Sequence, residues 1–239
     1  MVMNARAQRE PGAAPAPRTG KRIEALGLFE AAAKVPDVQP LAPGAVVLRG
    51  FASSSEHALA TALDEVLASA PFRHMITPGG FRMSVAMTNC GALGWVSDRS
   101  GYRYDAVDPC SGLPWPAMPR VFSKLATRAA AQAGFAAFEP DACLVNRYEP
   151  GARLTLHQDR NERDFAAPIV SVSLGLPAVF LFGGPERAHR ALRVPLRDGD
   201  IVVWGGPSRM RYHGVAPVKP GHHERCGGYR INLTFRKAG

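Results

Sequence analysis

The sequence lacks any apolar run long enough to cross a membrane. Its longest apolar stretch, residues 169–182, is interrupted by Ser171, Ser173, Gly175 and Pro177, whereas a membrane-spanning helix needs about 20 consecutive apolar residues. No apolar signal-peptide core follows the N-terminus either. We therefore expect no membrane partner and a cytoplasmic location.

Cysteine is scarce, and its spacing excludes two common uses. Cys90, Cys110, Cys143 and Cys226 form no C-x-x-C pair, so a structural zinc site is not indicated. Their spacing does not suggest a disulfide framework. Both observations favour a reducing, cytoplasmic environment.

Acidic residues are outnumbered, with 20 Asp and Glu against 29 Lys and Arg, which gives a net charge of +9. Excess positive charge attracts polyanions such as nucleic acids, although the charge alone fits a nonspecific basic surface equally well. Hydrophobic residues at 46% are typical of a globular protein with a core. The length of 239 residues suits one domain with an extension.

The first part of the chain divides into two regions. Residues 1–40, rich in alanine and proline, predict a flexible tail with room for a short helix at 23–34. Residues 41–140 predict an N-terminal extension with a strand at 45–48, a helix capped by serines at 53–55 and ending near 68, and a second helix between Pro119 and Gly134. Between the helices, basic residues interleave with aromatic ones: Arg73, Phe81, Arg82, Trp95, Arg99, Tyr102, Arg103 and Tyr104.

Residues 141–239 predict strand after strand, separated by glycine turns. The expected strands are 142–148, 153–157, 169–174, 178–182, 192–195, 200–204 and 229–236. Short, evenly spaced strands favour an antiparallel double-sheet roll that holds a ligand between its sheets. With the preceding helices, this predicts an α+β fold with a mainly β core, in one compact unit with the extension.

Three residues suggest a metal site. His157 and Asp159 are two apart on a predicted strand, so their side chains leave the same face. His213 follows the strand that ends at Trp204. A metal held by two imidazoles and one carboxylate keeps coordination positions open for oxygen and a co-substrate, as in non-haem iron oxygenases. An isolated H-x-D match is close to chance, however, and a strand-end histidine bonded to its neighbours is an equal interpretation. A second such motif, His222-His223-Glu224, lacks a downstream histidine.

The last strand strengthens the metal hypothesis. Alternation puts Arg230, Asn232, Thr234 and Arg236 on one face. Two inward arginines would be costly unless an anion meets them, and a dicarboxylate would do so, with Arg236 gripping one end and Arg230 the other. Considered alone, this face is expected to meet solvent, but the metal residues upstream reverse that preference.

Several long motifs match a known family. They are Thr77-Pro78-Gly79-Gly80, residues 83–91 (MSVAMTNCG), 114–119 (PWPAMP), 146–148 (NRY), 156–159 (LHQD), 169–177 (IVSVSLGLP), 202–206 (VVWGG) and 232–236 (NLTFR). On these motifs, residues 41–237 resemble the AlkB family of nucleic-acid demethylases. The resemblance implies a double-stranded β-helix, or jelly-roll, with a nucleotide-recognition lid in front.

The resemblance also implies roles for individual residues. The iron ligands would be His157, Asp159 and His213. The residues that hold 2-oxoglutarate would be Asn146, Tyr148, Arg230, Asn232 and Arg236. The substrate contacts would include Trp95, Tyr102, Asn161 and Arg187, with His157 as a ring on which the flipped base packs. For Phe81 and Tyr104 we expect ordinary packing instead.

The implied reaction consumes oxygen and 2-oxoglutarate at Fe(II). It hydroxylates a methyl group on a base nitrogen, so that formaldehyde, succinate and carbon dioxide leave and the base is repaired. The target base must leave the stack to be reached. The implied partner is single-stranded or double-stranded DNA, with RNA as an alternative, and we expect a monomer.

One position departs from the family pattern. Asn161 stands where the founding member has an acid that lies near the flipped base. A carboxylate there would favour a cationic alkylated base, so the base preference of this chain is open. Glu162 and Asp164 are candidates to compensate for the missing charge.

Three other functions compete with alkylation repair. The first is a 2-oxoglutarate dioxygenase that acts on tRNA, protein or a small molecule. The basic, aromatic lid argues against the protein and small-molecule substrates and leaves tRNA open. The second is a non-catalytic nucleic-acid-binding protein, which would have no need of the metal residues. The third is a zinc hydrolase with the same ligands, which leaves Arg230 and Arg236 without a role.

Overall fold

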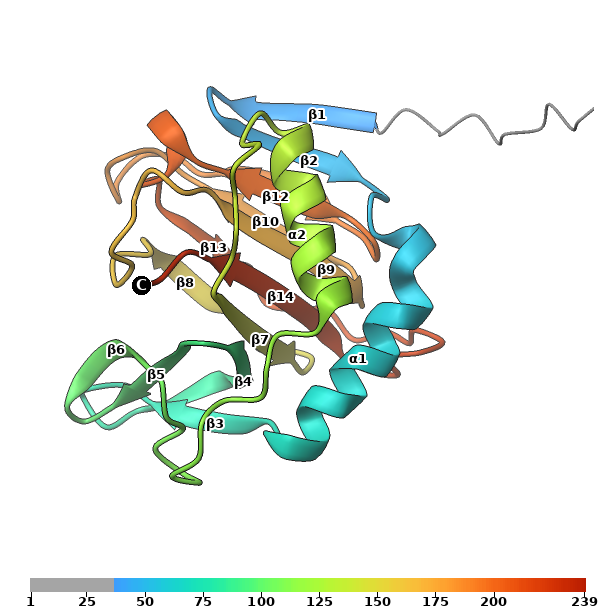
Figure 1. The fold of residues 1–239 in the computed structure, drawn as a ribbon. Coiled ribbons are helices and arrows are strands. Elements are labelled where there is room, and N and C mark those ends of the chain that lie inside the picture. The colour runs from blue at the N-terminus through green and yellow to red at the C-terminus, as the bar shows by residue number, and fades with distance from the viewer. Residues whose placement is uncertain (1–36) are drawn as a thin grey trace, which may run out of the picture. The chain divides into compact units, whose positions relative to one another are not determined.

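Two antiparallel sheets dominate the part of the chain that the computed structural model describes, residues 37–239 (Figure 1). The larger sheet has the order β1-β2-β12-β9-β14-β7-β4-β3, and the smaller sheet has the order β11-β10-β13-β8. A separate hairpin, β5–β6, completes the strands. This arrangement confirms the predicted α+β fold with its double-sheet core.

For the eight strands with predicted bounds, the observed bounds agree closely with the predicted ones. The larger sheet contains β1 (Asp37–Ala42), β2 (Ala45–Arg49), β3 (Arg73–Ile76), β4 (Arg82–Gly91), β7 (Ala142–Tyr148), β9 (Ile169–Gly175), β12 (Ile201–Trp204) and β14 (Arg230–Arg236). The smaller sheet contains β8 (Leu154–His157), β10 (Ala178–Phe182), β11 (Leu192–Leu196) and β13 (His213–Val215). The hairpin consists of β5 (Gly94–Asp98) and β6 (Gly101–Asp105).

Strands β1 and β13 were not predicted, and no bounds were predicted for β3, β4, β5 and β6. Strand β1 begins at Asp37, within the segment assigned to the tail, and pairs with β2 from Asp37↔Arg49 onward. The predicted tail boundary at residue 40 is therefore too late, because Gly44, with φ of 74°, turns the chain back into a hairpin. The predicted helix at 23–34 lies outside the described residues. Strand β13 has three residues, too few for a periodic pattern.

Two helices cover one face of the larger sheet (Figure 1). Helix α1 (Glu56–Ser69) follows a 3-10 turn at Ser53–Ser55, and the Ser55 side chain makes no capping hydrogen bond, contrary to the predicted serine cap. Helix α2 (Arg120–Gln132) ends before Gly134, as predicted. No helix among residues 37–239 is long and apolar enough to cross a membrane.

The apolar stripes of both helices form the main core with odd-numbered residues of β14. Leu59 and Leu63 of α1 and Phe122 of α2 are buried against Leu233 and Phe235, and the rings of Phe122 and Phe235 meet edge to face at 6.1 Å. Because strand side chains alternate, the even-numbered residues of β14 point to the opposite face, toward the smaller sheet. The fold thus fixes which face of β14 can meet a ligand.

Candidate functional site

A cavity of about 440 Å³ opens on the face of the larger sheet that is opposite the helices. Residues from β7, β9 and β14 form one wall, residues near β8 and β13 form another, and the β5–β6 hairpin contributes Trp95 and Tyr102. All four predicted substrate residues line it: Trp95, Tyr102, Asn161 and Arg187. The predicted metal and 2-oxoglutarate residues line it too: Asn146, Tyr148, His157, Asp159, His213, Arg230, Asn232 and Arg236.

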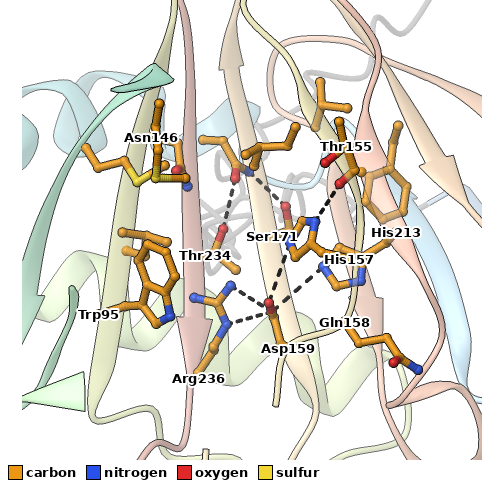
Figure 2. Close-up of a pocket in the computed structure, with 18 of the residues that line it drawn as sticks. Trp95, Asn146, Thr155, His157, Gln158, Asp159, Ser171, His213, Thr234 and Arg236 are labelled. Atoms are coloured by element: carbon orange, nitrogen blue, oxygen red, sulfur yellow. Dashed lines mark hydrogen bonds and ion pairs between the residues drawn. The ribbon is translucent and has the colours of Figure 1, made fainter. Parts of the chain in front are cut away.

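The two predicted histidine ligands are cross-strand neighbours, which the sequence did not predict. His157 ends β8 and pairs in register with His213, the first residue of β13. Asp159 Oδ1 lies 3.7 Å from His157 Nε2, and Asp159 Oδ2 lies 3.8 Å from His213 Nε2 (Figure 2). One ligand atom from each residue lies within 4.8 Å of the others. This compact set of two imidazoles and a carboxylate fits a divalent metal.

Backbone carbonyls orient both imidazoles. His157 Nδ1 donates to Thr155 O at 2.8 Å, and His213 Nδ1 donates to Arg211 O at 3.1 Å. Because a carbonyl oxygen only accepts, each Nδ1 carries a proton, and each Nε2 is the ring nitrogen that faces Asp159. This second layer of contacts is the usual support for histidine metal ligands.

The protonation states suit metal binding as well. Burial, with a smaller contribution from His157, lowers the pKa of His213 to about 3, so the ring is neutral at neutral pH. Burial alone would raise the pKa of Asp159, but Arg236 and the two histidines hold it well below its ordinary value. A neutral imidazole and an ionised carboxylate are the forms that ligate metals.

A second cluster, Glu56 with Asp198 and His223, has similar spacing but a different chemistry. His223 Nδ1 accepts the Cys226 N–H at 3.4 Å, which keeps the imidazole proton on Nε2, the atom that faces Asp198. Arg225 also pairs with Glu56 at 3.3 Å. This cluster fits an ion-pair group better than a metal site.

The even-numbered face of β14 is buried, so the solvent-facing alternative for this strand is wrong. Arg230 is 1% exposed, and its guanidinium lies 5.0 Å from the centre of the Tyr148 ring. Its Nη2 donates to Ser173 Oγ at 3.1 Å, whereas Nε and Nη1 have no hydrogen-bond partner among residues 37–239. Asn146 Oδ1 is also buried without a partner in that part of the chain. Because buried cations require a partner, the cavity near Arg230 fits an anion such as a carboxylate of 2-oxoglutarate.

The other three polar residues of β14 are bonded within the protein. Asn232 Nδ2 donates to Ser171 Oγ at 2.8 Å and to Val172 O at 2.9 Å, and its Oδ1 accepts from Thr234. Arg236 Nε and Nη2 both contact Asp159 Oδ2, at 2.8 and 2.7 Å (Figure 2). Arg236 therefore grips a carboxylate, as predicted for its side chain, but here it is the carboxylate of the proposed metal ligand.

The β5–β6 hairpin carries the aromatic residues of the lid. Trp95 and Tyr102 stack with ring centroids 5.6 Å apart and planes inclined by 15°. Trp95 Nε1 donates to Asn161 Oδ1 at 3.2 Å, and Asn161 Nδ2 donates to Tyr102 O at 3.3 Å. Asn161 thus faces the lid as well as the cavity.

Neither candidate replacement for the missing acid lines the cavity. Glu162 is buried, with its carboxylate between Tyr104, Arg209 and Arg236. Asp164 lies outside the cavity and accepts the Ala166 N–H at 2.8 Å. The hypothesis that one of them compensates for Asn161 is not supported, because their carboxylates are engaged elsewhere.

The two remaining lid aromatics behave differently from each other. Tyr104 packs as expected, and its hydroxyl donates to Glu162 at 2.8 Å. Burial raises the pKa of Tyr104 well above its ordinary value. Phe81 was expected to pack as well, but it is 76% exposed, because it follows the Gly79-Gly80 turn at the end of β3.

Three neighbours of the site residues, Ser171, Ser173 and Arg209, were not singled out from the sequence, and Glu162 was considered there only as a replacement for the missing acid. Ser171 and Ser173 bond to Asn232 and Arg230, and their alternation in β9 was a signal that could have found them. Glu162 and Arg209 pair at 3.0 Å across a loop and an irregular segment. No periodic pattern marks these two, so only the tertiary structure finds them.

Comparisons with known proteins agree on the family. Residues 44–236 match the model of the 2OG-Fe(II) oxygenase superfamily. The alpha-ketoglutarate-dependent dioxygenase AlkB of Salmonella typhimurium is 57% identical over 213 residues, which are 89% of this chain and 98% of that protein. The protein of the same name from Escherichia coli is 56% identical over 84% of this chain and 93% of its own length.

A solved structure supports the fold. The structure of OsALKBH1 superposes with a TM-score of 0.72 at 30% sequence identity, covering 84% of this chain and 99% of that one. The matches span both the double-sheet core and the segment before it. The chain therefore belongs to the AlkB dioxygenases of the 2OG-Fe(II) oxygenase superfamily.

Proposed function

We propose that this dioxygenase removes alkyl groups from nitrogens of nucleic-acid bases, in the repair of alkylation damage. The observation that carries the proposal is the stacked pair Trp95 and Tyr102, which lines the same cavity as His157, Asp159 and His213. A flat aromatic wall beside a metal site suits a base that has left the helical stack. The net charge of +9 favours a polyanionic substrate.

His157, Asp159 and His213 would hold Fe(II), with Nε2 of each imidazole and a carboxylate oxygen as ligands. Arg230 would hold a carboxylate of 2-oxoglutarate through the two nitrogens that have no partner among residues 37–239, and Asn146 and Tyr148 lie beside it. When bound, iron and 2-oxoglutarate supply the oxidation of the alkyl carbon with molecular oxygen. The protein contributes binding, orientation and exclusion of water.

The cavity wall suggests how a base would be held. Trp95 lies on the lid side of the cavity, and His157, with 37% of its side chain exposed, lies on the core side. A base between the two rings would place its alkyl group next to the metal ligands. Arg187 stands at the same cavity over the Tyr212 ring, where its charge would favour the phosphate backbone.

DNA is the proposed main substrate, with RNA as the second candidate. A base in a single strand leaves its stack at lower cost than one in a duplex, so we expect single-stranded DNA to react faster. We further propose that the enzyme acts as a monomer, since side chains of one chain provide the metal ligands, the anion site and the lid.

The test is a panel of DNA and RNA oligonucleotides that each carry one N-methylated base. Each is incubated with Fe(II), 2-oxoglutarate and oxygen, and formaldehyde and succinate are measured. We expect equal amounts of both products from methylated oligonucleotides and none from unmethylated ones. Turnover of methylated peptides or free metabolites, with no formaldehyde from any oligonucleotide, would contradict the proposal.

A further inference from the structure

Four charged side chains lie together behind the proposed metal ligands: Asp159, Glu162, Arg209 and Arg236. Arg236 Nε lies 2.8 Å from Asp159 Oδ2 and 3.4 Å from Glu162 Oε1, and Glu162 Oε2 lies 3.0 Å from Arg209 Nη2. None of the four side chains is more than 10% exposed. Two cations balance two carboxylates, which is the condition under which such charges are tolerated in an interior.

The lid hairpin joins this group through Tyr104. Its hydroxyl donates to Glu162 Oε1 at 2.8 Å, the same oxygen that faces Arg236. Tyr104 pairs with Trp95 across the hairpin, so one hairpin face carries both residues. The hairpin is therefore tied to Asn161 through Trp95 and to Glu162 through Tyr104, just after Asp159 in the chain.

The contacts also fix the orientation of the Asp159 carboxylate. Arg236 takes Oδ2 with two nitrogens, while Oδ1 remains 3.7 Å from His157 Nε2. Glu162 in turn holds Arg236 from the other side. Removing Glu162 would leave Arg236 with Asp159 as its one remaining carboxylate partner in residues 37–239, so the guanidinium would be held from one side only.

We propose that Glu162 and Tyr104 are positioning residues, which orient the Asp159 carboxylate through Arg236 and connect it to the lid hairpin. The inference rests on the proposed role of Asp159 as a metal ligand. Outer contacts of this kind typically change metal affinity by about 10- to 100-fold. Coupling between two sites is reciprocal. The factor by which docking of the hairpin raises the metal affinity therefore equals the factor by which metal binding favours the docked hairpin.

Tyr104→Phe tests the connection, because it removes the hydroxyl and leaves the ring. Mn²⁺ affinity is measured by titration calorimetry with 2-oxoglutarate present, and hydrogen exchange of residues 94–105 is measured with and without both ligands. We expect about three- to tenfold weaker Mn²⁺ binding and loss of the ligand-induced protection of the hairpin. Ser100→Ala is the matched control: it removes a hydrogen bond to Asp98 at the hairpin tip and should keep both properties.

Glu162→Gln is the second variant, since the amide oxygen still accepts from Tyr104 while the charge is lost. We expect about tenfold weaker Mn²⁺ binding. If Glu162 had a purely structural role, the variant would have a lower melting temperature but unchanged Mn²⁺ affinity and unchanged hydrogen exchange of the hairpin. Mn²⁺ affinity and hairpin protection equal to wild type in both variants would overturn the inference. Failure of the proposed function is distinguishable: no formaldehyde would come from any methylated oligonucleotide while wild-type Mn²⁺ binding persists, whereas Mn²⁺ binding that survives Asp159→Ala would show that Asp159 is not a ligand.

Discussion

The indole nitrogen of Trp95 donates a hydrogen bond to Oδ1 of Asn161, 3.2 Å away, which joins the lid to the segment that follows Asp159. The amide nitrogen of Asn161 meanwhile donates to Tyr102 O. A neutral side chain thus makes both contacts at the position where the resemblance to the AlkB family implies an acid.

Asn161→Asp should shift activity toward cationic alkylated bases. The carboxylate can still accept from Trp95 but adds a negative charge to the cavity wall, and a charge pair at a few ångströms is worth about 1 kcal/mol or more near a protein surface. We expect the ratio of kcat/KM for cationic over neutral methylated bases to rise about fivefold. Asn161→Ser, which stays neutral, should leave this ratio near that of the wild type, and an unchanged ratio in Asn161→Asp would count against the electrostatic argument.

Arg230→Met should weaken 2-oxoglutarate binding. The buried guanidinium has two nitrogens without a partner among the described residues, and a charge-assisted bidentate contact to a carboxylate is a strong interaction. We expect the KM for 2-oxoglutarate to rise at least about tenfold, because loss of such a pair costs about 2 kcal/mol or more. Steady-state succinate formation measures it. Arg193→Met, on an exposed position of β11, is the control, and equal KM values in the two variants would refute the assignment.

His157→Ala and Asp159→Ala should each abolish turnover while leaving nucleic-acid binding measurable. Each substitution removes one of the three side chains proposed to bind the metal but leaves the basic surface and the stacked rings of Trp95 and Tyr102 in place. Formaldehyde release and fluorescence anisotropy of a labelled oligonucleotide report the two properties separately, and a chelator should reproduce the loss in the wild type. Asp164→Ala, outside the cavity, should retain turnover. Activity in both ligand variants would show that the metal residues are misassigned.

Asp108→Asn should destabilise the protein at neutral pH and much less in acid. Burial would raise the pKa of Asp108, but hydrogen bonds from Arg73, the Cys110 N–H and Ser111 hold it below its ordinary value. A lowered carboxyl pKa contributes stability above the unfolded pKa of about 4, and the contribution is lost as pH falls below that value.

Because Asp108→Asn weakens the ion pair with Arg73, we expect the free energy of unfolding at pH 7 to fall by about 1–3 kcal/mol. The difference from wild type should shrink as the pH falls from about 5 toward 3. Denaturant unfolding at several pH values measures it, with the exposed Asp64→Asn as the control. A difference that stays constant down to pH 3 would mean that the ion pair is not its source.

Much of the fold followed from the sequence because its strands have strong local patterns. The β14 segment alternates polar and apolar residues, which fixes one face toward Phe122 and the other toward the cavity. The helices at Glu56–Ser69 and Arg120–Gln132 carry apolar stripes of the expected period. The family motifs located the candidate site residues, all of which line one cavity.

Other features depended on contacts between distant segments. The pairing of His157 with His213, the engagement of Arg236 with Asp159, and the tie from Tyr104 to Glu162 each join residues whose local sequence does not identify the partner. Strand β1 and the exposure of Phe81 likewise depend on how a glycine turn directs the chain.

Spacing and alternation along the chain predicted the residue types of a metal site, an anion site and an aromatic lid, because they fix which side chains share a face. Which of these side chains meet depended on the folded structure. It placed Asn161 against Trp95 and Tyr102, and it engaged Glu162 and Asp164 away from the cavity. The physical reason is that hydrogen bonds and ion pairs between loops depend on three-dimensional packing, which carries no periodic signal in the chain.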